Sequence, residues 1–429
     1  MAPMPTLGRY RIVDRIAADA FVETYRSRLD GIAGFHRMFT IQRLHPQAAR
    51  LPGLMTALED DVRRAALLTH GNLTQVLDLG RDRGTVHVVA EDVDGTDLAS
   101  LLARLRERRE RLPLPLAVHI AIDVLSGLVY AHGRTEGDEL QRGPRAGVLH
   151  GDVHSSHVKI GRRGEVKLAG FGLGRARRAA TAAGHGPARR LAEATAPERL
   201  EGEPTTPRTD IFLVGVVLFE AITGDHPFRR AGIAEAQQAE AMRDAILDGH
   251  VPSLRARRAD APEALAAIVH DALSRAPGDR PASAASMRDR LMDLVNAGVV
   301  ERTGTTELGL FVEARLDTTP AATAEQLTGW LDAVSDDIAA VPEPTQPAPF
   351  EDDDDDDDDA TPPTPVAPPV VRRVSPPPTT PEPPPAPTPT TSSPSARTPR
   401  PRRAFVLMLL LAAVALSAWM SGLLDGVSL

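Results

Sequence analysis

The sequence contains no cysteine, which excludes disulfides and thiolate metal sites. Lysine is almost as scarce, because only Lys159 and Lys167 among the 49 basic residues are lysines. The N-terminus lacks the continuous apolar core of a signal peptide, so we expect no cleaved leader. Eight charges of the net −9 belong to Asp352–Asp359, and the remainder is close to neutral. No basic face for nucleic acid is therefore expected.

The C-terminal part divides into segments of very different composition. Residues 341–403 are dominated by Pro, Thr, Ala and Asp, and such a segment cannot bury enough apolar surface to fold. Residues 404–424 carry no charge and would span about 31 Å as a helix, which matches a bilayer core. Arginines precede this helix and only residues 425–429 follow it. We predict a single-pass membrane protein with a disordered linker and a cytoplasmic N-terminal domain.

The first 300 residues show strand patterns followed by helix patterns. Five short β-type runs are predicted, at 10–16, 21–29, 37–44, 74–80 and 85–93. Apolar residues at helical spacing lie between the third and fourth runs, and again over 116–132 and 210–223. Strands first and helices second predict an α+β fold in two lobes. After 296 an apolar stripe from Leu327 to Ile338 predicts a helix that docks back on the domain or, alternatively, binds a partner.

Several ordered motifs make residues 9–295 resemble the protein kinase family, in particular bacterial Ser/Thr kinases. VLHGDVHSSHVKI (148–160) is similar to the family's catalytic loop, and GEVKLAGFGLGRA (164–176) to the strand and metal-binding loop that follow it. ATAPERL (194–200) contains Ala-Pro-Glu, and 210–228 is similar to the central buried helix. The resemblance implies a two-lobed kinase-like domain at 9–295, with 296–340 as a helical extension.

The N-terminal lobe departs from the family at each position that would hold ATP. Ala17, Asp19 and Val22 stand where the family has the glycines that let backbone approach phosphate. Asp19 would also repel phosphate. Gln42 replaces the strand lysine, and Asp61 stands at the position of the helix glutamate, where we expect it to find no lysine partner. Because neither lysine lies in this lobe, no relocated lysine can substitute.

The catalytic loop is only partly retained. Asp152 stands at the position of the proton acceptor, but Gly151 replaces the arginine before it. His157 replaces the metal-binding asparagine, and Gly170 replaces the aspartate that is the principal Mg²⁺ ligand of the family. We therefore expect neither ATP nor Mg²⁺ to be bound as a cofactor. His150, Asp152, His154 and His157 could in principle bind a transition metal. However, His150 should point inward while its neighbours face other ways, so we predict no metal site and regard His157 as the only candidate ligand.

The scaffold residues of the family remain. His150 and Phe171 can stack in the interior, Asp210 can hold the catalytic-loop backbone, and Glu198 can pair with Arg280. A kinase-like architecture that lacks the residues for phosphoryl transfer indicates a pseudokinase. Its partners would be the membrane and other signalling proteins, such as an active kinase. The alternative is an atypical Ser/Thr kinase that uses Asp152 as base with a non-standard nucleotide site. A third hypothesis is a metal- or ligand-sensing module.

Overall fold

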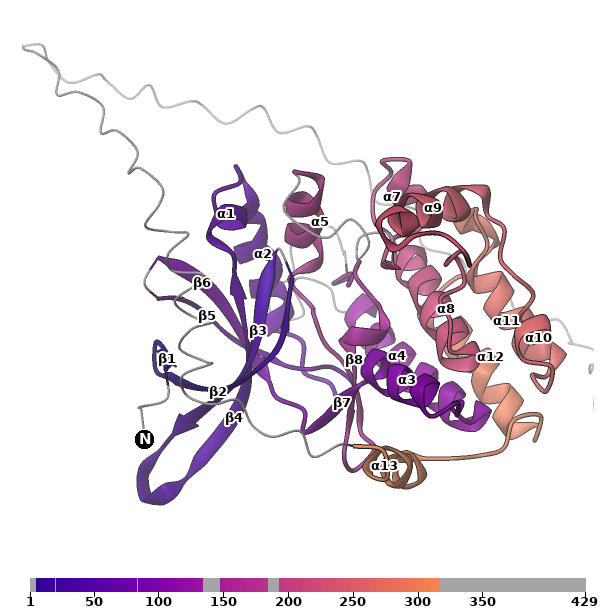
Figure 1. Cartoon of the computed structure of the whole chain (residues 1–429), viewed down its shortest axis with the longest axis horizontal. Coiled ribbons are helices and arrows are strands. Elements are labelled where there is room, and N and C mark those ends of the chain that lie inside the picture. The colour runs from indigo at the N-terminus through magenta and orange to yellow at the C-terminus, as the bar shows by residue number, and fades with distance from the viewer. Residues whose placement is uncertain (1–4, 20, 83, 134–146, 184–192, 317–429) are drawn as a thin grey trace, which may run out of the picture. The chain divides into compact units, whose positions relative to one another are not determined.

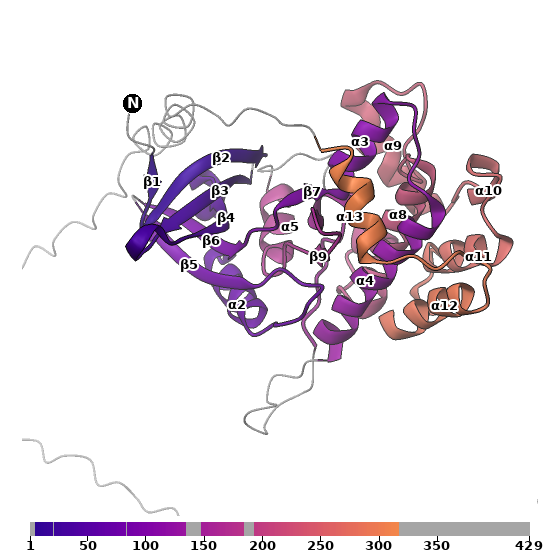
Figure 2. The same cartoon turned by 90° about the horizontal axis from the view of Figure 1, so that it is seen from below.

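The computed structural model describes residues 5–19, 21–82, 84–133, 147–183 and 193–316, and these are the coloured parts of Figures 1 and 2. The predicted linker (341–403), membrane helix (404–424) and tail (425–429) lie outside the described residues. The same holds for the apolar stripe from Leu327 to Ile338. The limits predicted for these segments therefore stay predictions.

The N-terminal lobe is an antiparallel sheet with the strand order β1-β2-β3-β4-β6-β5. Its strands are β1 (Thr6–Leu7), β2 (Tyr10–Ala18), β3 (Val22–Asp30), β4 (His36–Leu44), β5 (Val76–Asp82) and β6 (Thr85–Glu91). A short 3₁₀ turn, η1 (Ile32–Gly34), joins β3 to β4, and the helices α1 (Pro46–Ala49) and α2 (Leu54–Ala66) lie between β4 and β5. The five β-type runs predicted from the sequence correspond to β2 to β6.

Each face of this sheet has its own apolar cluster, because side chains alternate between the two faces of a strand. Ile12, Tyr25 and Ile41 are buried in a cluster confined to the strands. Leu58 and Val62 of α2 belong instead to the large core that continues into the C-terminal lobe. Helix α2 is therefore attached to the second lobe as well as to the sheet.

The C-terminal lobe is mainly helical, with one small sheet in the order β7-β8-β9. Its strands are β7 (Gly95–Asp97), β8 (Val158–Gly161) and β9 (Val166–Leu168). Its helices are α3 (Leu98–Glu107), α4 (Leu114–Gly133), α5 (Gly174–Ala182), α7 (Pro197–Leu200), α8 (Pro207–Thr223), α9 (Glu235–Asp248), α10 (Leu254–Arg257), α11 (Glu263–Ala272), α12 (Ala284–Asn296) and α13 (Thr305–Glu313), with 3₁₀ turns η2 (Ser155–His157) and η3 (Pro277–Asp279). The predicted two-lobed α+β arrangement is confirmed.

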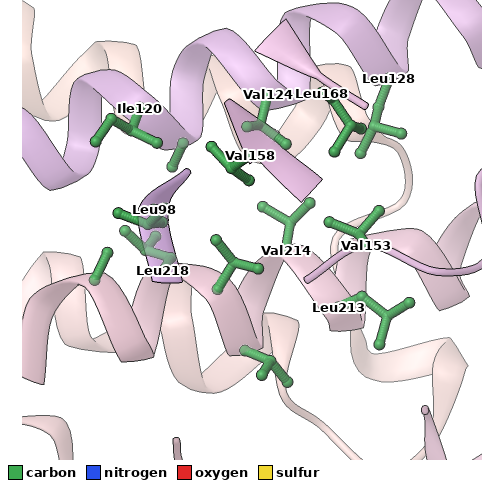
Figure 3. Close-up of a cluster of buried hydrophobic side chains, with 14 of the residues drawn as sticks. Leu98, Ile120, Val124, Leu128, Val153, Val158, Leu168, Leu213, Val214 and Leu218 are labelled. Carbon is green, nitrogen blue, oxygen red and sulfur yellow. The ribbon is translucent and has the colours of Figure 1, made fainter. Parts of the chain in front are cut away.

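Helix α8 is the centre of this lobe. A capping box between Thr206 and Thr209 starts it, with Pro207 in the first turn, and Gly224 ends it in the left-handed conformation at φ 84°. Nearly every side chain of the helix is buried. Figure 3 shows its residues Leu213, Val214 and Leu218 facing apolar side chains of α4, β8 and the catalytic loop. This core fixes the position of the catalytic loop.

Helix α4 is the one helix among the described residues that is long and apolar enough to cross a membrane, with a mean hydropathy of 1.7. More than half of that stretch is buried inside the fold, and the helix contacts α8 and α12. It is therefore the core helix of the lobe.

Two helices after β9 matter for the site. Helix α5 lies beside α2, at the junction of the two lobes (Figure 1). Helix α13 packs on β8, where a Cβ on Gly164 would lie 1.8 Å from the carbonyl oxygen of Thr305. The described start of the extension after 296 is thus in contact with the domain.

Candidate functional site

Asp210 of α8 holds the backbone of the catalytic loop through hydrogen bonds. Its carboxylate accepts hydrogen bonds from the backbone N–H of His150 (3.0 Å) and of Gly151 (2.7 Å), and from His132 Nε2 (2.8 Å). Burial opposes its ionisation, but the hydrogen bond and charge of His132 outweigh burial and hold the pKa of Asp210 below its ordinary value. Val153 and Val158, on either side of the loop's 3₁₀ turn, are fully buried against α8 and α4 (Figure 3).

His150 is part of the interior frame, as the sequence suggested. Its Nε2–H donates to the carbonyl of Ala169 (2.8 Å), and its Nδ1 accepts the N–H of Asp152 (3.1 Å). The ring meets that of Phe171 edge-on, with centroids 4.5 Å apart. Burial lowers the pKa of His150, so the imidazole is neutral and both of its nitrogens are committed.

Asp152, at the base position, faces a cation. Its Oδ2 lies 3.5 Å from Nε of Arg177, which comes from α5, and both side chains are more than nine-tenths buried. Arg177 also forms an ion pair with Asp19, in the turn between β2 and β3, and its guanidinium lies over the ring of Phe21 at 5.2 Å. One arginine therefore joins the tip of the N-terminal lobe to the catalytic loop.

The turn that holds Asp19 differs from the glycine turn of the family. The Asp19 carboxylate accepts the backbone N–H groups of Phe21 (2.8 Å) and Val22 (2.9 Å). Burial opposes its charge, but Arg177 and these amides hold the pKa of Asp19 below its usual range. Asp19 thus engages the amides of Phe21 and Val22 in this turn. Its charge is neutralised by Arg177, a contact that the sequence analysis missed.

Asp61 meets neither lysine, as expected, but it has an arginine partner that the sequence analysis did not predict. Arg175 of α5 donates from Nε to Asp61 Oδ2 at 3.0 Å, and it also reaches the carbonyl of Ala57 at 2.9 Å. Burial nevertheless raises the pKa of the Asp61 carboxyl, since it outweighs the attraction of Arg175. Helix α5 therefore supplies the partner that the family takes from a strand lysine.

A third arginine of α5 fills the place beside Gly151. Arg178 donates to the Gly151 carbonyl, and a Cβ at Gly151 would lie 2.8 Å from an Arg178 nitrogen. Gly151 also has φ +66°, a conformation that favours glycine. An arginine at position 151, as the family has, does not fit while Arg178 is there.

The strand positions of the nucleotide site carry no compensating cation of their own. Ala17 and Gln42 pair along the backbone with Thr24 on β3, and Val22 pairs with Leu44. The two lysines lie elsewhere: Lys159 pairs with Asp97 at 3.8 Å and Lys167 with Glu91 at 3.0 Å. Neither lysine takes the place of the missing strand lysine.

His157 and Gly170 share one space. A Cβ built on Gly170 would lie 2.7 Å from two atoms of the His157 ring and 2.9 Å from a third, closer than real side chains approach. Gly170 also has φ +93°. The imidazole therefore occupies the room that an aspartate side chain at position 170 would need. The two substitutions that remove the Mg²⁺ ligands of the family depend on each other sterically.

The catalytic loop brings three of its polar side chains together, contrary to the expectation that they face different ways. Asp152, His154 and His157 are all buried, and each offers a ligand atom within 4.8 Å of the others. The rings of His154 and His157 lie 3.8 Å apart. His150 lies outside this group, as predicted.

Glu198 and Arg280 form the buried pair that the sequence suggested. Arg280 binds the Glu198 carboxylate with two nitrogens, at 2.8 and 2.7 Å, and donates to the carbonyls of Ser274, Arg208 and Arg275. The pKa of Glu198 is lowered because Arg280 and Thr209 outweigh burial, which alone would raise it. This pair fixes the loop before α8.

These landmarks agree with a comparison to known families, in which residues 54–292 match the protein kinase domain. The chain belongs to the protein kinase family. The match begins at Leu54, after strands β2 to β4 and the turn that contains Asp19. The family match thus covers α2, β5, β6 and the greater part of the C-terminal lobe.

Two bacterial kinases show the similarity along the chain. The tyrosine-protein kinase MasK of Myxococcus xanthus is 30% identical over 306 residues, which are 71% of this chain and 46% of MasK. The serine/threonine-protein kinase PknL of Mycobacterium tuberculosis is 31% identical over 286 residues, 65% of this chain and 64% of PknL. The chain thus spans less than two thirds of each of these relatives.

The fold is also that of a solved kinase domain. The PknI kinase domain of Mycobacterium tuberculosis matches with a TM-score of 0.51 at 23% identity, covering 68% of this chain and 98% of that domain. At this identity the likeness shows the kinase fold and nothing finer.

Proposed function

We propose that this protein is a membrane-tethered pseudokinase that acts as a scaffold or allosteric regulator in signalling and does not transfer phosphate. The observation that carries the proposal is the pairing of Arg177 with both Asp152 and Asp19. The base position and the phosphate-covering turn are bound to each other through one buried cation. A nucleotide in the family's pose would need both of them.

The chemistry of phosphoryl transfer makes these losses severe. Such transfer relies on positioned cations around the phosphates, and one well-placed arginine can change the rate by about a thousandfold. Gln42 and Gly170 carry no charge, so the lysine and the principal Mg²⁺ ligand are both gone. We therefore propose that neither ATP nor Mg²⁺ serves as a cofactor.

A thermal unfolding titration of the full chain with ATP, with and without Mg²⁺, tests this. A ligand at about 1000 times its dissociation constant adds about 4 kcal/mol to the apparent free energy of unfolding. No Mg²⁺-dependent shift and no incorporation of labelled phosphate are expected. A shift by ATP alone without transfer would make nucleotide a regulatory ligand.

The alternative is an atypical Ser/Thr protein kinase with Asp152 as base and a non-standard nucleotide site. The retained Asp152 and the kinase names of the relatives favour it. It predicts labelled phosphate incorporation that Asp152→Ala abolishes. Kinase activity that co-purifies with the full chain and survives in Asp152→Ala would belong to a bound active kinase, and would support the scaffold.

The tether is a separate part of the proposal. Residues 404–424 would anchor the chain, and the domain would face the cytoplasm. The full chain should resist extraction from membranes by alkaline carbonate, whereas a chain ending at residue 403 should be extracted. Equal extraction of the two chains would refute the anchor.

A further inference from the structure

We propose that Asp152, His154 and His157 form a binding site for a divalent transition-metal ion of the Zn²⁺ class. One ligand atom from each side chain lies within 4.8 Å of the other two, and all three residues are more than nine-tenths buried. This inference goes beyond the proposed regulator role and does not depend on it.

The loop geometry brings the three side chains together. The 3₁₀ turn η2 begins after His154, and the N–H of His157 bonds the His154 carbonyl at 2.9 Å. The turn places the centroids of the two imidazoles 3.8 Å apart, with the ring planes tilted by 35°. The chain then folds back so that His157 Nδ1 meets the backbone carbonyl of Asp152 at 2.8 Å.

That last hydrogen bond prepares His157 for metal. A carbonyl oxygen only accepts, so Nδ1 carries the proton and Nε2 carries the lone pair. Metal-binding histidines commonly donate their other N–H to a carbonyl in this way.

Two imidazoles and one carboxylate select the class of ion. Zn²⁺, Co²⁺ and Fe²⁺ accept this set, whereas Mg²⁺ prefers oxygen ligands in an octahedron. Ligand atoms about 2.1 Å from a tetrahedral ion lie about 3.4 Å apart. The widest separation between these ligand atoms, up to 4.8 Å, therefore has to close by up to about 1.4 Å.

An ion at this site competes with α5. Arg177 Nε is 3.5 Å from the Asp152 oxygen, and a divalent ion bound to that carboxylate would repel the guanidinium. Binding of the ion and the Arg177–Asp152 pair therefore oppose each other. By linkage, removal of the arginine charge should tighten metal binding.

The experiment uses the full chain, purified with a histidine-free tag and stripped with EDTA. Titration with Co²⁺ followed by absorbance, then displacement by Zn²⁺, should give one ion per chain. His154→Ala and His157→Gln should each weaken binding by at least about 100-fold. Arg177→Gln should strengthen it by about tenfold or more. His119→Ala is the matched control, because His119 and Asp123 form another His–Asp contact at 3.9 Å, and its affinity should equal that of the wild type.

Three results would overturn the site. They are no stoichiometric Co²⁺ absorbance for the wild type, wild-type affinity in both His154→Ala and His157→Gln, or weaker binding in Arg177→Gln. If the histidine variants do not fold, X-ray absorption of the wild-type Zn²⁺ complex decides. Two imidazoles and a carboxylate support the site, and any other ligand set refutes it.

Discussion

The shared space of Gly170 and His157 gives a prediction that can be worked out from the structure. Replacing Gly170 by alanine adds a Cβ that meets the His157 ring at 2.7 Å while the backbone remains at φ +93°. The positive φ costs an L-residue about 1–2 kcal/mol, and forcing extra volume into a packed site costs about 1–3 kcal/mol. Gly170→Ala should therefore lower the free energy of unfolding by about 2–5 kcal/mol.

A matched glycine separates the two costs. Gly172 has φ +87°, but its added Cβ would lie 3.1 Å or more from Val62, without severe overlap. Gly172→Ala should therefore cost mainly the strain, about 1–2 kcal/mol, with a smaller adjustment at Val62 than the one His157 requires. The difference between the two alanine variants measures the overlap with His157.

The overlap also predicts a coupling between positions 157 and 170. His157→Asn removes the ring, so adding Gly170→Ala to it should cost about 1–3 kcal/mol less than adding it to the wild type. Urea unfolding of the wild type, both single variants and the double variant, all in EDTA, measures this coupling. Additivity within about 0.5 kcal/mol would show that the ring does not fill the space at position 170.

Three further predictions concern other buried groups. Arg280→Ala leaves the Glu198 carboxylate buried without its cation, and should cost about 3–5 kcal/mol in urea unfolding; a cost below about 1 kcal/mol would contradict the buried pair. Arg177→Gln should speed hydrogen exchange of the α5 amides without affecting α8, and unchanged exchange in α5 would show that the arginine does not hold that helix. Burial raises the pKa of Glu220, in a cavity of about 500 Å³ beside Ser155, to about 7. Between pH 4.5, the pKa of this carboxyl in the unfolded chain, and pH 7, the native carboxyl keeps a proton that the unfolded chain loses. Over this range the free energy of unfolding of the wild type should therefore fall by about 3 kcal/mol relative to that of Glu220→Gln. A difference between the two proteins that does not change with pH would refute the pKa shift.

The large elements could be predicted because their signals are local. The apolar stretch at 116–132 became α4, the one at 210–223 became α8, and the alternating runs became β2 to β6. The interior contacts of His150 with Phe171 and of Glu198 with Arg280 followed from the resemblance to kinases, since these residues keep the family's types.

Helix α5 could not be predicted in the same way. The segment that contains Arg175, Arg177 and Arg178 shows no periodic apolar pattern. The acidic partners of Arg175 and Arg177 lie in other elements of the fold. A charge argument could have found them. Buried carboxylates need cations, and with both lysines in the small sheet, the arginines after Gly172 were among the candidates. The convergence of His154 with His157 was missed because it depends on the turn η2, which no pattern in the sequence indicated.

Other residues of the domain compensate for the substitutions in the nucleotide site. Restoring the family's residues at single positions would therefore not restore the family's site. Asp61 and Asp19 would each be a partly buried acid without a cationic partner if only the family's lysine and glycines were lost, yet α5 supplies Arg175 and Arg177 to them. Gly170 is small where His157 is large. Restoring lysine at position 42 alone would therefore leave Arg175 on Asp61 and Arg177 on Asp152. Binding at this site, by nucleotide or by metal, would have to compete with the ion pair between Arg177 and Asp152.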